Sequence, residues 1–227
     1  ASPALLRRLA RHLLAEARRF DAAVVSDYDK GTVTPELLAE VLPALEKAGV
    51  PVFLDPRTRH AESYRPITVL TPNEREAGEI AGVEMGGEAA LWEAGRRLLE
   101  MLGCPYVLIT RGQRGMALFE RQGQVRSIPA MAQEVYDVTG AGDTVIAALA
   151  LAYAAGASMF EAALIANCAA GRAVAHVGTA APTATELCAA LLDGARRTPN
   201  YVAWQTRSKS PTPGPTGRFR RFKKGLD

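Results

Sequence analysis

Short apolar runs alternate with amphipathic stretches of helical period along the first half of the chain, and this alternation restricts the fold more than any other feature. Apolar runs of strand length occur at residues 22–26, 50–54, 68–70 and 106–110. The segments around them repeat leucine and alanine at helical spacing. Strands that alternate with helices predict a parallel sheet that is covered by helices on both faces.

Helix start and stop signals support this interpretation. Ser2-Pro3 and Thr34-Pro35 each place a capping hydroxyl before a proline at the first helical position. Gly49 and Gly103 follow the last periodic residues of two predicted helices, as C-terminal caps often do. The helices predicted in this way cover about residues 3–19, 35–48, 74 onward, 88–102, 141–156, 158–176 and 184–193.

The strand pattern changes between Gly115 and Ile128. Two short runs are separated there by Gln122-Gly123, which indicates an antiparallel hairpin at the edge of the sheet. We therefore expect an α/β fold of three layers, with a mainly parallel sheet flanked by helices and an antiparallel edge hairpin. Residues 1–197 are predicted to form this domain. The basic segment 198–227, rich in Pro, Ser and Gly, is predicted to be a disordered tail.

Charge and cysteine content exclude several classes of protein. Residues 207–227 hold seven of the 27 Lys and Arg residues but only one of the 24 Asp and Glu residues, so the preceding part is mildly acidic. This argues against nucleic-acid binding as the main activity, although the tail alone could contact nucleic acid or anionic lipid. Three widely separated cysteines indicate neither a disulfide framework nor a zinc site. No apolar run approaches the roughly 20 residues of a membrane span, and we expect a cytoplasmic protein without a membrane partner.

The segment Asp137-Val138-Thr139-Gly140-Ala141-Gly142-Asp143 carries the strongest chemical signal. Small residues at the start of a long helix let backbone N–H groups approach a phosphate closely, and the helix N-terminus adds a partial positive charge. Asp143 lies at the anion end, where a carboxylate could take the proton of an acceptor hydroxyl during phosphoryl transfer. As an alternative, Asp143 is only a favourable partner of the helix dipole.

Two further motifs follow predicted strands, where ligands bind in parallel sheets. Asn73 and Glu76 have the spacing of a capping box at the start of a helix. Thr110, Gly112 and Gly115 follow the strand at 106–110 and could form only a tight turn into the hairpin. Local physics alone leaves both the structural and the ligand-binding interpretation open.

The segment 137–143 resembles the C-terminal signature of the PfkB, or ribokinase-like, carbohydrate kinases, and the resemblance covers roughly residues 20–193. It implies ATP and Mg²⁺ as cofactors, an anion hole at Gly140, Ala141 and Gly142, and Asp143 as the catalytic base. The Asn73-x-x-Glu76 pattern resembles the family motif that positions Mg²⁺ and the phosphates, generally through water. The residues that the resemblance places beside the nucleotide are Asn73, Glu76, Thr110, Gly112, Gly115 and Asn167.

Other stretches resemble heptose 7-phosphate kinases, namely residues 26–31, 55–57 with 64–65, and 133–136. This implies phosphorylation of the 1-position of D-glycero-β-D-manno-heptose 7-phosphate and assigns Asp27, Lys30 and Arg57 to the substrate. Two cations at strand ends would suit a phosphorylated sugar, although exposed basic residues are usually only solvated. A kinase for another sugar and a non-catalytic nucleotide-binding fragment are the alternatives.

The resemblance does not include the Gly-rich sugar-binding segment and lid strands with which the family begins. We therefore expect a kinase domain that is incomplete at its N-terminus, with much of the sugar pocket and the lid-mediated dimer surface absent. Small-molecule partners, ATP and a sugar phosphate, follow from the resemblance. A homodimer and the activity of this chain by itself stay open.

Overall fold

The computed structural model describes residues 1–131, 137–175 and 181–197, so the predicted tail at 198–227 and the stretch 133–136 lie outside the described residues. Its helices are α1 (Pro3–Glu16), α2 (Pro35–Ala48), α3 (Glu74–Ala81), α4 (Glu88–Leu102), α5 (Ala141–Ala154), α6 (Met159–Ala173) and α7 (Ala184–Arg197). Its strands are β1 (Ala23–Ser26), β2 (Val52–Asp55), β3 (Val69–Leu70), β4 (Tyr106–Thr110), β5 (Met116–Glu120) and β6 (Val125–Ile128).

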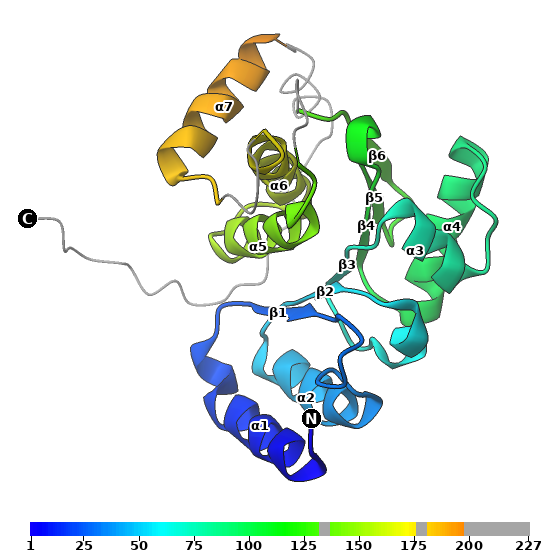
Figure 1. The fold of residues 1–227 in the computed structure, drawn as a ribbon, viewed down its shortest axis with the longest axis vertical. Helices are drawn as coiled ribbons and strands as arrows, with labels where there is room; N and C mark the ends of the chain where they lie inside the picture. Colours follow the sequence, from blue (N-terminus) through cyan, green and yellow to red (C-terminus); the bar gives the residue numbers. More distant parts are fainter. Residues whose placement is uncertain (132–136, 176–180, 198–227) are drawn as a thin grey trace, which may run out of the picture.

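The six strands form one sheet in their sequence order. The first four are parallel, and β4–β5 and β5–β6 pair antiparallel, so the predicted edge hairpin is confirmed. Each parallel crossover steps to the next strand in the same direction, and a uniform crossover hand then puts α2, α3 and α4 on one face. Figure 1 shows this arrangement, with α5 and α6 on the opposite face. The predicted three-layer α/β fold is thus confirmed.

Each face of the sheet has its own hydrophobic core, because successive side chains of a strand point to opposite faces. In β2, Val52 and Leu54 pack with α2 and α4, whereas Phe53 packs with α5 and α6. All three side chains are almost fully buried. A strand buried on both faces must be apolar throughout, which explains the uninterrupted apolar runs of the sequence.

The predicted element boundaries agree with the structure to within a few residues. Ser2 and Thr34 cap α1 and α2 through their hydroxyl groups, and Gly49 and Gly103 adopt left-handed conformations at the ends of α2 and α4. Short 3-10 turns occur in addition at Ala17–Arg19, Thr58–Ser63 and Gly112–Arg114. Within the described ranges, no helix is long and apolar enough to cross a membrane.

Candidate active site

The carboxyl ends of the parallel strands bring the predicted motifs to one edge of the sheet. Ser26 and Asp55 are register partners at the ends of β1 and β2. Asn73, which follows β3, forms a bridge with Thr110, the last residue of β4, and the Thr110 N–H donates a hydrogen bond of 2.9 Å to the carbonyl of Pro72. Segments that are far apart in the sequence therefore meet where a parallel sheet places its ligands.

The N-terminus of α5 lies at the same edge. Gly140 is the N-cap, with a left-handed backbone (φ 77°, ψ 3°), and Ala141 begins the helix. A Cβ atom added to Gly142 would meet nothing within 4 Å, so this turn is open on its outer side. Upstream, the carboxylate of Asp137 accepts a hydrogen bond of 2.9 Å from the Thr139 N–H. The first turn of a helix has backbone N–H groups without partners in the helix itself, so this open turn is suited to an anion.

Asp143, in the first turn of α5, is exposed and bonded to the loop after β1. The hydroxyl of Tyr28 lies 2.8 and 2.7 Å from its two carboxylate oxygens, and the hydroxyl of Ser26 lies 3.4 Å from one of them. The hydrogen bond to Asp143 raises the pKa of Tyr28, because it favours the protonated phenol. No sequence pattern predicts this contact, since Tyr28 and Asp143 are 115 residues apart.

Asp27 points the other way and is 1% exposed. Its carboxylate accepts a hydrogen bond of 2.7 Å from the hydroxyl of Tyr64 and another of 2.8 Å from the N–H of Asp29. Burial, followed by the hydrogen bond to Asp27, raises the pKa of Tyr64. In this structure Asp27 therefore holds the loop after β1, and its predicted substrate contact stays a prediction. Lys30 is exposed on the same loop.

Asn73 and Glu76 form the predicted capping box of α3. The Asn73 side chain accepts a hydrogen bond of 2.9 Å from the Glu76 N–H, and the Glu76 carboxylate accepts one of 3.0 Å from the Asn73 N–H. Glu76 is 4% exposed, and its second oxygen pairs with Arg57 at 2.6 Å. Arg57, predicted to contact substrate, is thus committed to an ion pair here.

The hydrogen bonds and the ion pair of Asn73 and Glu76 bear on the predicted role of these two residues in positioning Mg²⁺. Both oxygens of Glu76 and the amide oxygen of Asn73 already accept hydrogen bonds, and Arg57 neutralises the carboxylate. No group of three or more His, Cys, Asp or Glu side chains able to hold a metal ion occurs in the described part of the chain. In this structure the oxygens of Asn73 and Glu76 serve the capping box and the ion pair with Arg57, and the predicted positioning of Mg²⁺ by these two residues, generally through water, stays a prediction.

Gly115 and Asn167, two of the residues predicted to lie beside the nucleotide, both contact the segment after β6. Gly115 has φ 82°, and its Cα lies so close to this segment that an added Cβ would fall 1.9 Å from the carbonyl oxygen of Ile128. Asn167, on α6, is 4% exposed, and its side-chain amide donates a hydrogen bond of 2.8 Å to the carbonyl of Pro129. The buried amide of Asn167 therefore ties α6 to the segment after β6.

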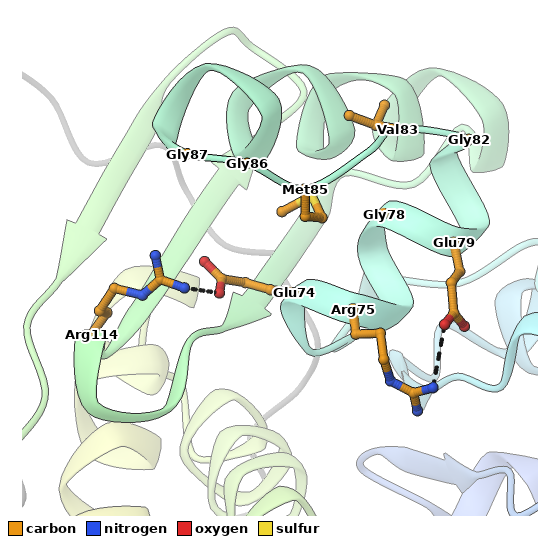
Figure 2. Close-up of a pocket in the computed structure, with 10 residues that line it drawn as sticks. All are labelled: Glu74, Arg75, Gly78, Glu79, Gly82, Val83, Met85, Gly86, Gly87 and Arg114. Carbon is orange, nitrogen blue, oxygen red and sulfur yellow. Dashed lines mark hydrogen bonds and ion pairs between the residues drawn. The ribbon is translucent and has the colours of Figure 1, made fainter.

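Ion pairs tie the loop after β4 to the start of α3. The buried guanidinium of Arg111 donates to Glu74 over 2.9 Å and also pairs with Glu88. Figure 2 shows Arg114 paired with the same Glu74, at the rim of a pocket of about 860 Å³ that is lined by α3, the segment 82–87 after it and Arg114. This pocket contains none of the predicted nucleotide or sugar residues, so it lies beside the candidate site.

Residues 5–186 match the profile described as pfkB family carbohydrate kinase. The chain belongs to this family. The bifunctional protein HldE of Geobacter sulfurreducens is 46% identical over 185 residues, which is 82% of this chain and 38% of that protein. HldE of Geobacter metallireducens is 45% identical over 172 residues, which is 76% of this chain and 35% of that protein. The chain spans less than two fifths of the length of these curated relatives.

Solved structures of carbohydrate kinases share the fold. Ribokinase of Arabidopsis thaliana, determined with ribose and ATP, has a TM-score of 0.68 and 27% identity, over 78% of this chain and 58% of that one. Phosphofructokinase-2 of Escherichia coli has a TM-score of 0.71 at 18% identity, over 81% of this chain and 61% of that one. The predicted ribokinase-like architecture is confirmed by these likenesses.

Asp55, at the end of β2, is a further carboxyl group at this edge of the sheet, which the sequence indicated only as part of the stretch 55–57. Burial raises its pKa to about 7, and the charges of Glu76, Asp143 and Asp27 act in the same direction while Arg57 opposes them. The folded state therefore keeps a proton on Asp55 between about pH 4 and pH 7 that the unfolded chain releases. The free energy of unfolding should fall as the pH rises through this window and level off above it.

The variant Asp55→Asn should lose this part of the pH dependence, because an amide has no proton to release. We expect its free energy of unfolding to exceed that of the parent by about 1–3 kcal/mol at pH 8, with a much smaller difference at pH 4. Urea denaturation of both chains at the two pH values measures this. A difference that is the same at pH 4 and pH 8 would contradict the raised pKa of Asp55.

Proposed function

We propose that this chain is the nucleotide-binding and catalytic part of a kinase that transfers the terminal phosphoryl group of ATP to a hydroxyl of a phosphorylated sugar. The observation that carries the proposal is Asp143, held by Tyr28 beside the open first turn of α5. The backbone donors of residues 140–143 offset the charge of the phosphoryl group. Asp143 accepts the proton of the acceptor hydroxyl, the hydroxyl oxygen bonds to phosphorus, and ADP leaves.

The nucleotide is proposed to contact two groups of segments at the carboxyl ends of the strands. The terminal phosphates lie at residues 140–143, and the base lies between the loop 110–115 and the part of α6 that holds Asn167. The bridge between Asn73 and Thr110 and the bond from Asn167 to Pro129 keep these segments together. Mg²⁺ bound with the nucleotide would offset the charge of the phosphates, and Asn73 and Glu76 are the residues proposed to position it through water.

Calorimetry of this chain with ATP and Mg²⁺ tests the nucleotide site. We expect measurable heat, and a gain in the free energy of unfolding of about 2.7 kcal/mol when free nucleotide is at 100 times its Kd. The variant Asp21→Asn, at the opposite end of β1, is a control that should bind equally well. Absence of both heat and stabilisation at millimolar nucleotide would count against the proposal.

For the sugar we propose the 1-position of D-glycero-β-D-manno-heptose 7-phosphate. The support comes from the resemblance of residues 26–31 and 55–57 to heptose 7-phosphate kinases, together with 46% identity to HldE. Lys30, exposed in the loop after β1 whose Tyr28 contacts Asp143, is the cation proposed to meet the sugar phosphate. Assays of the longest natural form of the protein with heptose 7-phosphate, ribose and fructose 6-phosphate decide this: preference for either of the other sugars contradicts it.

A further inference from the structure

The loop after β1 presents its side chains alternately to the two faces of the sheet, as an extended backbone does. Ser26 and Tyr28 point toward α5 and reach Asp143, whereas Asp27 points to the opposite side and is buried against Tyr64. The buried carboxylate of Asp27 also accepts the N–H of Asp29, which fixes the backbone on the far side of Tyr28. The direction of the Tyr28 side chain is therefore set by an anchor in the protein interior.

A second contact holds the ring of Tyr28. The guanidinium of Arg57 lies over the ring, 5.5 Å from its centroid, and its position is set by the ion pair with Glu76 and by a bond of 3.2 Å to the carbonyl of Pro56. Glu76 belongs to the capping box with Asn73. Tyr28 is thus held from its backbone and from its ring, although the residue is 50% exposed.

We propose that Tyr28 is a positioning residue for the base: its hydroxyl holds the carboxylate of Asp143 in the orientation that receives the acceptor proton. This inference rests on the proposed role of Asp143. A carboxylate accepts about four hydrogen bonds, so Tyr28 can keep its contact while the sugar hydroxyl donates to the same group. An exposed aspartate in a first helical turn otherwise samples several rotamers, and small displacements of a catalytic group are costly in rate.

The variant Tyr28→Phe removes the hydroxyl and keeps the ring under Arg57. In the longest natural form of the protein, we expect kcat to fall by about 10- to 100-fold, because the carboxylate loses its fixed orientation. The KM values for ATP and for heptose 7-phosphate should change by less than about twofold, because Tyr28 acts through Asp143 and not on the ligands. The variant Tyr153→Phe, which removes a hydroxyl from the other end of α5, is the matched control and should keep the parent kcat.

A double-mutant cycle separates positioning from a general structural role. In a chain that already carries Asp143→Asn, Tyr28→Phe should lower the residual kcat by less than about twofold, since there is no base left to orient. An equal loss in both backgrounds would overturn the inference. So would an unchanged or increased kcat in the single variant, or a change confined to the KM for the sugar.

The same cycle distinguishes failure of this inference from failure of the proposed function. If Asp143→Asn retains nearly the parent kcat, the assignment of Asp143 as base falls, and the role of Tyr28 falls with it. If Asp143→Asn loses activity while Tyr28→Phe keeps it, only the positioning role of Tyr28 is overturned. Circular dichroism melting of each variant shows that the fold is retained, as expected for a side chain that is half exposed.

Discussion

The variant Asp143→Asn, in the longest natural form of the protein, is expected to lower kcat by about 10²- to 10⁴-fold, which corresponds to roughly 3–5 kcal/mol of barrier. Asparagine keeps the size of the side chain and the backbone donors of residues 140–143, but it does not take up the proton of the acceptor hydroxyl. ATP affinity should therefore stay within about twofold of the parent value. Steady-state kinetics with heptose 7-phosphate and calorimetry with ATP measure the two quantities.

A role of Asp143 as a mere partner of the α5 dipole predicts a different result. Loss of the charge would then remove about 0.3–1 kcal/mol of stability and leave turnover close to normal. The control Asp21→Asn also removes one exposed carboxylate, but at the end of β1 that is remote from the site. Near-normal turnover in Asp143→Asn would overturn the role of Asp143 and the proposed function with it.

The fold was predictable because its signals are local and repeated. Caps at Ser2 and Thr34, glycines after helices and uninterrupted apolar strands each mark one element, and the rule that ligands bind at strand ends places 73–76, 110–115 and 140–143 at one edge. The hairpin was recognisable because its pattern broke the alternation of strands and helices. None of these inferences required knowledge of a contact between distant residues.

The partners within the site were not predictable, because they join segments that are far apart in the sequence. Tyr28 meets Asp143, Arg57 pairs with Glu76, and Asn167 bonds to the segment after β6. Sequence spacing could identify the capping box of Asn73 and Glu76, but it could not show that Arg57 neutralises the carboxylate of Glu76. Nor could it show that Asp55 lies among four charged groups, which gives it a raised pKa.

The two glycines of the loop after β4, Gly112 and Gly115, look equivalent in sequence, but their surroundings in the structure differ. An alanine Cβ at Gly115 would fall 1.9 Å from the carbonyl oxygen of Ile128 and 2.6 Å from the N–H nitrogen of Ala130, both of which belong to the backbone. At Gly112 it would meet nothing within 4 Å. Both residues have a positive φ, 82° and 56°, so both substitutions carry some strain.

The variant Gly115→Ala is accordingly expected to lower the free energy of unfolding by about 3–5 kcal/mol, since a clash with backbone adds to the strain of the left-handed conformation. Gly112→Ala should cost only about 1 kcal/mol. Urea denaturation of the two variants and the parent measures both values. A cost at Gly115 no larger than that at Gly112 would mean that the segment 128–130 can move away, and that Gly115 is not required by this close approach.

ATP affinity can be measured in the Gly112→Ala variant to test whether the nucleotide contacts this loop. Gly112→Ala is expected to remain folded, because its Cβ would meet no protein atom within 4 Å. The nucleotide is proposed to lie against this open side of the loop. A loss of ATP affinity of about tenfold or more in this variant would therefore come from the ligand approaching the backbone at Gly112. Unchanged ATP affinity would restrict the loop to its structural role, which is to turn the chain from β4 into the hairpin and to bring Gly115 against the segment that Asn167 holds.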